Sequence, residues 1–259
     1  GETVSGILEG NQLTDIRVEA PSDDRVKAPC RHYKSCGGCQ LQHASDGFVA
    51  EWKTDVVRTA LTAQGLETEF RRIHTSPPGA RRRATLAVRR TTKGAMAGFH
   101  GQASDVITEI PDCQLVEPAL KAAIPVAEAL AMAGASRKTP LAVTVTTSDA
   151  GLDILVRNGK PLDGPLRIKL AQLADQNRIA RLTWDDEPVA MEQPPVQPFG
   201  AARVCPPPGA FLQATRDGEA ALLAAVQEIT GGAKRIVDLF AGCGTFSLPL
   251  AQTAEVHAV

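Results

Sequence analysis

The chain has 259 residues, of which 43% are hydrophobic and 22% are charged, and its formal net charge is −1 at pH 7. A chain of this length can bury a sizeable core, and we expect two or more domains. The balanced charge excludes a wholly basic nucleic-acid coat protein, and no hydrophobic run reaches the ~20 residues of a membrane-spanning helix. Because no secretory leader opens the chain, we expect a cytoplasmic protein without disulfides.

Residues 1–28 contain short β-like runs broken by glycine. This pattern is typical of the end of a small barrel rather than of a complete domain. The last residues, in turn, break off within an α/β pattern, so half of a doubly wound sheet would be left with an open edge. We therefore expect the natural protein to be longer at both ends.

Four cysteines form a pattern of three plus one: Cys30, Cys36, Cys39 and Cys113. The first three lie in CRHYKSCGGCQLQH, where Gly37 and Gly38 allow the backbone to turn closely around a bound group. Four thiolates commonly hold an iron–sulfur cubane, whereas structural zinc sites usually show two closely spaced pairs of ligands. The spacing therefore favours an iron–sulfur cluster, with zinc as the alternative.

After the cysteines, apolar side chains recur at helical spacing at Val49, Trp52, Val56 and Leu61. This spacing predicts a helix whose apolar stripe packs on a core. We expect Trp52 to belong to that core rather than to contact a ligand.

The stretch between Arg71 and Ser104 contains no Asp or Glu. Within it, residues 82–90 alternate, which predicts a strand with one packed face and one charged face. The plain alternative is a solvated strand face, but the acid-free flanks favour contact with RNA phosphates, which would position RNA without reading its sequence. The predicted RNA-contacting residues are Arg81, Arg82, Arg83, Arg89 and Arg90.

The middle of the chain is mixed α/β. A helix at 115–133 is predicted to be bent or interrupted by Pro125. The following elements are a hairpin of strands 141–147 and 152–157, a helix near 166–175 and a strand at 179–184. Proline is dense from 188 to 209, and we place a domain boundary there.

A helix at 219–229 leads to the second motif, KRIVDLFAGCGTFSLPLA. It reads as an apolar strand, a glycine turn at Gly242 and Gly244, and the start of a helix, an arrangement that lets a cofactor approach the backbone. A dinucleotide-binding turn is the alternative, but the full G-x-G-x-x-G pattern is absent. The form resembles the first motif of class I S-adenosylmethionine methyltransferases.

Taken in this order, the motifs resemble the iron–sulfur branch of the RNA uracil-5-methyltransferases, which acts on 23S rRNA. The resemblance rests on CRHYKSCGGCQLQH, RRRATLAV, GAFLQAT and VDLFAGCGTFSLPLA, and it spans nearly the whole chain. It implies an α/β fold in three parts. These parts are the end of a TRAM-like β domain at 1–28, a central iron–sulfur and RNA-binding domain at 29–205, and the start of a Rossmann-like methyltransferase domain at 206–259.

The resemblance also implies ligands. The four cysteines would bind a [4Fe-4S] cluster, and S-adenosylmethionine would be contacted by Gln213, Asp238, Phe240, Gly242, Gly244 and Thr245. Taken alone, Gln213 is merely a polar loop residue, and Thr245 departs from the asparagine often found at its position. Because the related tRNA enzymes usually lack the cluster, 23S rRNA is the expected partner, tRNA is the alternative, and we expect a monomer.

Such enzymes attack C6 of a flipped-out uracil with a cysteine thiolate, which makes C5 nucleophilic. In the family, the thiolate and the general base lie beyond the first methyltransferase motif, so we assign no catalytic residue within the 259 residues. Cys205 and Cys243 are expected to be free thiols outside the nucleophile's place. We expect this polypeptide alone to be inactive. Competing hypotheses are a non-catalytic iron–sulfur RNA-binding module and an electron carrier.

Overall fold

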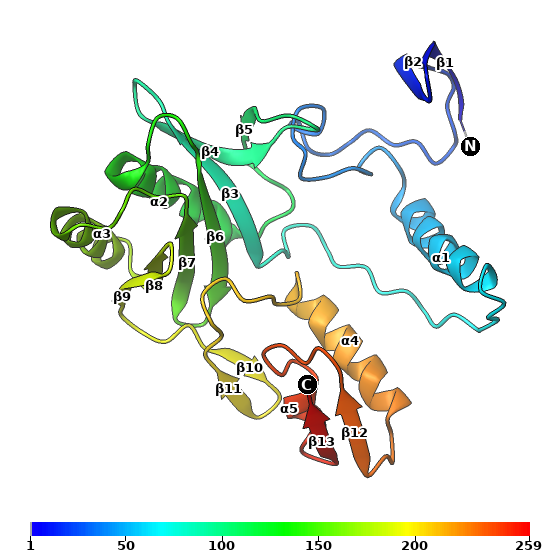
Figure 1. Ribbon diagram of the computed structural model, residues 1–259. Coiled ribbons are helices and arrows are strands. Elements are labelled where there is room, and N and C mark those ends of the chain that lie inside the picture. Colours follow the sequence, from blue (N-terminus) through cyan, green and yellow to red (C-terminus); the bar gives the residue numbers. More distant parts are fainter. Residues whose placement is uncertain (1) are drawn as a thin grey trace. The chain divides into compact units, whose positions relative to one another are not determined.

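The computed structural model describes residues 2–259, which form two compact units (Figure 1). The first unit comprises the residues up to 34 together with 39–73, and the second comprises 35–38 and 74–259. Among the helices of the described residues, none has the length and apolar character needed to cross a membrane.

The first unit contains a two-stranded antiparallel hairpin, β1 (Thr3–Glu9) and β2 (Gln12–Ala20), followed by a long loop and a helix. Helix α1 (Asp46–Thr62) begins after Ser45, whose hydroxyl accepts from the backbone N–H of Phe48 at 3.2 Å. This is the usual way to satisfy a free amide at a helix start.

The predicted helix is confirmed as α1, but its predicted core is not found. None of its residues is buried, and Trp52 is 45% exposed. The physical reason is the size of the unit: one hairpin, one loop and one helix provide too little chain to enclose an apolar stripe. Periodicity indicates which face of a helix is apolar, and it does not show that a second layer exists to cover that face.

The second unit is built on a seven-stranded mixed sheet in the order β5-β4-β3-β6-β7-β8-β9. Its strands are β3 (Arg83–Arg90), β4 (Ala95–His100), β5 (Ile107–Glu109), β6 (Leu141–Ser148), β7 (Gly151–Arg157), β8 (Ile179–Trp184) and β9 (Glu187–Met191). All neighbours are antiparallel except β7 and β8, which are parallel and are joined by a helical crossover. The predicted strand at 82–90, the hairpin and the strand at 179–184 are thereby confirmed.

Helices α2 (Pro118–Gly134) and α3 (Gly164–Gln176) lie on one face of this sheet (Figure 1). The main core is between them and the sheet, where Leu86, Val143 and Ile154 are fully buried. The helix predicted at 115–133 is present, but it is not interrupted: α2 continues through Pro125 as one helix.

The proline-rich stretch after β9 is more ordered than a simple linker. It includes a small antiparallel pair, β10 (Gln197–Phe199) and β11 (Ala202–Val204). Helix α4 (Arg216–Ile229) and strand β12 (Arg235–Asp238) follow, then the short helix α5 (Ser247–Leu250) and strand β13 (Glu255–Ala258). Strands β12 and β13 are parallel, as in a βαβ unit.

Candidate functional site

The glycine turn predicted as a cofactor site follows strand β12 directly. Gly242 has φ = 57° and Gly244 has φ = 85°, a region of backbone conformation that favours glycine. A Cβ at position 244 would also lie 2.8 Å from Cδ1 of Leu248, in the first turn of α5. The local backbone therefore favours glycine at both positions, and close packing against Leu248 adds a second requirement at Gly244.

Phe240 lies at the centre of the same turn in an unusual conformation. Its φ is 62°, and the residue is 97% exposed. A bulky residue in the left-handed region is strained, and such residues persist where the surrounding structure fixes them, often at binding sites. Here the backbone is fixed by hydrogen bonds from Ala241 N to Val259 O at 3.0 Å and from Gly244 N to Ala241 O at 2.9 Å.

Asp238 ends β12 and ties the turn to the helix that follows. Its carboxylate accepts a hydrogen bond from the hydroxyl of Ser247 at 2.5 Å, and its backbone carbonyl accepts from Val259 N at 3.0 Å. Thr245 is half-buried in the same turn. Asp238, Phe240, Thr245 and the two glycines thus all lie between the end of β12 and the start of α5.

Gln213 is positioned by a different element. Residues 81 and 215 form an isolated antiparallel bridge, and Arg82 N donates to Ala214 O at 2.9 Å. The backbone carbonyl of Gln213 accepts from Nε of Arg82 at 3.0 Å. The segment 211–215, which carries Gln213, is therefore anchored along the start of β3.

The structure corrects the prediction that Arg82 contacts RNA. Its residue exposure is 1%, and its guanidinium is engaged by Glu219 at 2.6 Å as well as by the carbonyl of Gln213. The reason is its position in the strand: Arg82 shares the inward face with Ala84 and Leu86.

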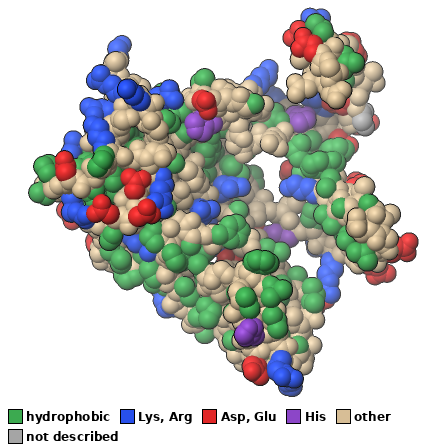
Figure 2. Space-filling model, viewed as in Figure 1, with side chains coloured by type: hydrophobic (Ala, Val, Ile, Leu, Met, Phe, Trp, Pro, Cys, Tyr) green, Lys and Arg blue, Asp and Glu red, His purple; other side chains and the backbone are tan. Residues whose placement is uncertain are grey.

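The other predicted RNA-contacting arginines are less deeply placed. Arg81, Arg83, Arg89 and Arg90 are half-buried. Nη2 of Arg83 donates to Gly209 O at 3.0 Å, whereas within residues 2–259 the Nε atoms of Arg83 and Arg89 are buried without a hydrogen-bond partner. Figure 2 shows Lys and Arg side chains gathered on the second unit near the turn between β3 and β4.

The four predicted cluster ligands are divided between the two units. Cys36 and Cys113 belong to the second unit, are 8% and 7% exposed, and join its hydrophobic core, whereas Cys30 and Cys39 belong to the first. Across the described residues, no group of three or more His, Cys, Asp or Glu side chains is arranged to hold a metal ion. All six cysteines are described, and none of them forms a disulfide.

The two buried cysteines share one local geometry. The sulfur of Cys36 accepts from the amide of Gly38, and the sulfur of Cys113 accepts from the amide of Leu115, both at 3.4 Å. Amide donors aimed at sulfur stabilise thiolates and tune iron–sulfur clusters. A Cβ at Gly37 would lie 2.8 Å from the backbone oxygen of His100, so the turn around Cys36 requires a small residue.

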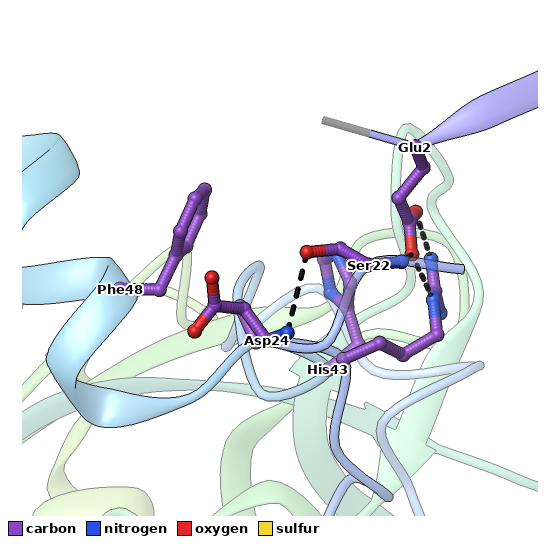
Figure 3. Close-up of a pocket in the computed structure, with 7 residues that line it drawn as sticks. Glu2, Ser22, Asp24, His43 and Phe48 are labelled. Carbon is purple, nitrogen blue, oxygen red and sulfur yellow. Dashed lines mark hydrogen bonds and ion pairs between the residues drawn. The ribbon is translucent and has the colours of Figure 1, made fainter. Parts of the chain in front are cut away.

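The sequence did not predict the pocket in the first unit (Figure 3). Glu2, Ser22, Asp24, His43 and Phe48 are among its lining residues. Its charges are satisfied internally: a hydrogen bond from Arg25 holds the pKa of Glu2 at about 2. The Asp24 carboxylate accepts from the Ser45 hydroxyl at 2.8 Å. The pocket therefore aims no unsatisfied charge at a ligand.

Comparison with known proteins places this chain among RNA methyltransferases, although no family model matches it. It is 38% identical to an uncharacterized RNA methyltransferase of Rhizobium meliloti over its whole length, and 31% identical to one of Zymomonas mobilis, of which it covers 68%. It is 29% identical, over 98% of its length, to the 23S rRNA (uracil(1939)-C(5))-methyltransferase RlmD of a Marinomonas species. The chain spans 64% of the length of the Rhizobium relative and 60% of the Marinomonas relative.

A solved structure has a similar fold. The tRNA (uracil-54, C5)-methyltransferase of Pyrococcus abyssi, in complex with S-adenosyl-L-homocysteine, matches the whole chain with a TM-score of 0.65 and 18% identity, and 71% of that chain is covered. The fold is thus a mixed α/β fold close to that of a tRNA uracil-5 methyltransferase. The sequence identities show that the chain belongs to the RNA methyltransferase family.

Proposed function

We propose that the protein methylates C5 of uracil in 23S rRNA with S-adenosylmethionine as the methyl donor. The observation that carries the proposal is the glycine turn after β12, with Gly242 and Gly244 at positive φ, in a chain of the RNA methyltransferase family. The activity named for the Marinomonas relative supports the base and the rRNA substrate, and the S-adenosyl-L-homocysteine bound to the Pyrococcus protein supports the donor.

In this proposal, the cofactor lies against the turn of residues 238–245. Glycine at 242 and 244 lets a ligand approach the backbone closely, and the exposed ring of Phe240 offers an apolar surface to it. Asp238 and Thr245 line the same turn, and Gln213 contributes from the segment anchored on β3. The bound cofactor supplies an electrophilic methyl group on a sulfonium.

Neither thiol near this region suits the nucleophile that attacks uracil C6. Burial raises the pKa of Cys243, which keeps its thiol protonated and weakens it as a nucleophile. Cys205 lies between β11 and α4, before the glycine turn, whereas the family places its nucleophile after that turn. We therefore assign no nucleophile within residues 1–259 and expect this polypeptide alone not to methylate RNA.

We also propose a [4Fe-4S] cluster on Cys30, Cys36, Cys39 and Cys113. The amide donors directed at the sulfurs of Cys36 and Cys113 support thiolate ligands at both positions. The test is iron and acid-labile sulfide analysis, with visible absorption, on anaerobically purified protein. Cys113→Ser should abolish the iron content, whereas Cys205→Ser should preserve it. Stoichiometric zinc without sulfide would overturn the assignment.

For RNA binding, we propose Arg81, Arg83, Arg89 and Arg90. Arg82 is not included, because it is buried. Support comes from the partial exposure of these four side chains, and from the lack of any Asp or Glu between Arg71 and Ser104 that would compete with phosphate. If these arginines contact phosphates, Arg89→Ala should weaken binding similarly for unrelated RNA sequences and reduce its salt dependence by about one phosphate contact.

The family organisation follows as part of the proposal. The hairpin β1–β2 is assigned to the end of a TRAM-like domain at 1–28, residues 29–205 to the iron–sulfur and RNA-binding part, and 206–259 to the start of the methyltransferase domain. The parallel pairing of β12 and β13, as in a βαβ unit, supports the assignment of residues 206–259.

The activity is tested with the full-length protein and labelled S-adenosylmethionine. Unmodified 23S rRNA and unmodified tRNA transcripts are offered separately, and nucleosides are analysed by mass spectrometry. We expect 5-methyluridine in 23S rRNA. Modification of tRNA alone would favour the second candidate substrate, to which the Pyrococcus fold neighbour points. RNA binding without any methyl transfer would support a non-catalytic binding module and overturn the proposal.

A further inference from the structure

Three arginines of the central sheet hold the backbone of the segment that leads to Gln213. Arg181 Nη2 donates to Pro206 O at 2.7 Å, and Arg83 Nη2 donates to Gly209 O at 3.0 Å. Arg82 Nε donates to the carbonyl of Gln213 at 3.0 Å. A stretch that its prolines marked as a domain boundary is therefore clamped onto the sheet at intervals of three to four residues.

Arg82 differs from the other two because it also holds the helix that follows. Its Nη2 lies 2.6 Å from Oε2 of Glu219, in the first turn of α4, and the two side chains are 2% and 15% exposed. One guanidinium thus fixes both ends of the segment 213–219. The planar fork of arginine suits this task, because its donors point in fixed and different directions.

The backbone around Arg82 is equally constrained. Its N–H donates to Ala214 O at 2.9 Å, and its carbonyl accepts from the N–H of Thr147 at 3.0 Å and from the hydroxyl of Thr147 at 3.3 Å. That hydroxyl shares its single proton between this carbonyl and the carboxylate of Glu117, which lies just before α2. Arg82 therefore links the segment 213–219 to the rigid centre of the sheet.

A buried ion pair is a costly way to obtain stability, because apolar side chains of similar volume often serve as well or better. What a buried ion pair adds is a fixed register between the two segments that it joins. We propose that Arg82 is a positioning residue for the cofactor: it sets the register of Gln213 against β3, so that the Gln213 side chain is presented to S-adenosylmethionine. The inference rests on the proposed function and names a determinant of cofactor affinity within it.

The experiment compares variants of the full-length protein by S-adenosylhomocysteine binding, measured by calorimetry, and by thermal unfolding. Arg82→Lys keeps the charge but cannot direct two separate donors as the guanidinium does. We expect its Kd for S-adenosylhomocysteine to rise by about tenfold or more, the scale of one lost charged hydrogen bond. RNA affinity should stay within about twofold of the wild type, because Arg82 is buried.

A double variant separates positioning from stability. Arg82→Met with Glu219→Leu replaces the pair by apolar groups, which should restore much of the stability lost in Arg82→Met alone. If Arg82 is a positioning residue, the cofactor affinity of the double variant stays low although its fold is stable. Recovery of both properties would show a purely structural role.

Arg167→Met is the matched control. Arg167 also bonds one carbonyl and one carboxylate, Pro188 O at 2.8 Å and Glu187 at 2.6 Å, but its side chain is 43% exposed and lies on α3. This variant should bind S-adenosylhomocysteine like the wild type. If Arg82→Lys also binds like the wild type, the inference fails while the proposed function stands. Wild-type protein that binds no S-adenosylhomocysteine would overturn both.

Discussion

Replacing Arg181 by Met while Asp153 remains should strongly destabilise the second unit. The two side chains are 7% and 8% exposed and form a bidentate pair, with Nε to Oδ1 at 2.8 Å and Nη2 to Oδ2 at 2.7 Å. Burial opposes the charge on Arg181, but hydrogen bonding and attraction from Asp153 keep its pKa above the usual range. The substitution would leave a carboxylate in a nearly dry site on the face of β7.

The magnitude follows from that burial. Removing one partner of a buried pair costs about 3–5 kcal/mol in the free energy of unfolding, because the other charge stays uncompensated. For a unit of this size, 1 kcal/mol corresponds to roughly 2–4 °C, so the midpoint should fall by about 6–20 °C. Asp153→Leu should have an effect of similar size, since it leaves the guanidinium with only its bonds to Pro206 O and Cys205 Sγ.

The assay is thermal and urea unfolding followed by circular dichroism, with four proteins in a cycle. Combining Asp153→Leu with Arg181→Met should recover most of the loss, apart from about 1 kcal/mol for the missing bond to Pro206 O. Arg157→Met is the control, because its pair with Asp186 is exposed and should be worth at most about 1 kcal/mol. A double variant whose loss equals the sum of the single losses would falsify the reasoning.

Two further predictions concern the second unit. A hydrogen bond from His74 at 2.8 Å is the main cause that lowers the pKa of Asp217 from 3.8 to about 2. Its stabilising effect should be complete above about pH 4 and lost as the pH falls towards 2, so Asp217→Asn should flatten the dependence of unfolding on pH in that window. At Gly98, a Cβ would lie 1.9 Å from the backbone oxygen of Thr108. Gly98→Ala should therefore separate β5 from β4 and speed amide exchange in β5, whereas Gly94→Ala, which has open space, should leave exchange unchanged.

The regular elements of the second unit could be predicted because their signals are local. The alternation along residues 82–90 and the hairpin turn between 148 and 151 both follow from neighbouring residues, and both are found as β3 and β6–β7. The positive φ angles at Gly242 and Gly244 are local requirements too, so the glycine turn was predictable. The exposure of Trp52 could not be predicted, because it depends on whether the rest of its unit provides a layer that covers this side chain.

The burial of Arg82 has a signal in the sequence. Counting by twos from Ala84, Leu86 and Val88 places Arg82 on the same inward face, so the alternation that predicted the strand also predicted the burial. The sequence alone could not identify the residue that pairs with Arg82. Glu219 lies 137 positions away, and nothing local in either residue's surroundings indicates the pairing.

The face on which each side chain lies also limits what an arginine-rich stretch indicates about RNA binding. A run of like charges indicates a binding surface only for the residues that the strand turns outward, and its inward residues serve the fold. In RRRATLAVRR, Arg82 forms an ion pair with Glu219, and Arg83 donates one hydrogen bond to Gly209 O. Within the described residues the Nε atom of Arg89 lacks a partner, as that of Arg83 does, but Arg89 lies near the end of β3, before the turn into β4. If RNA binds β3, the loss on Arg89→Ala should therefore exceed the loss on Arg83→Ala, because Arg83 is already committed to positioning the segment that carries Gln213.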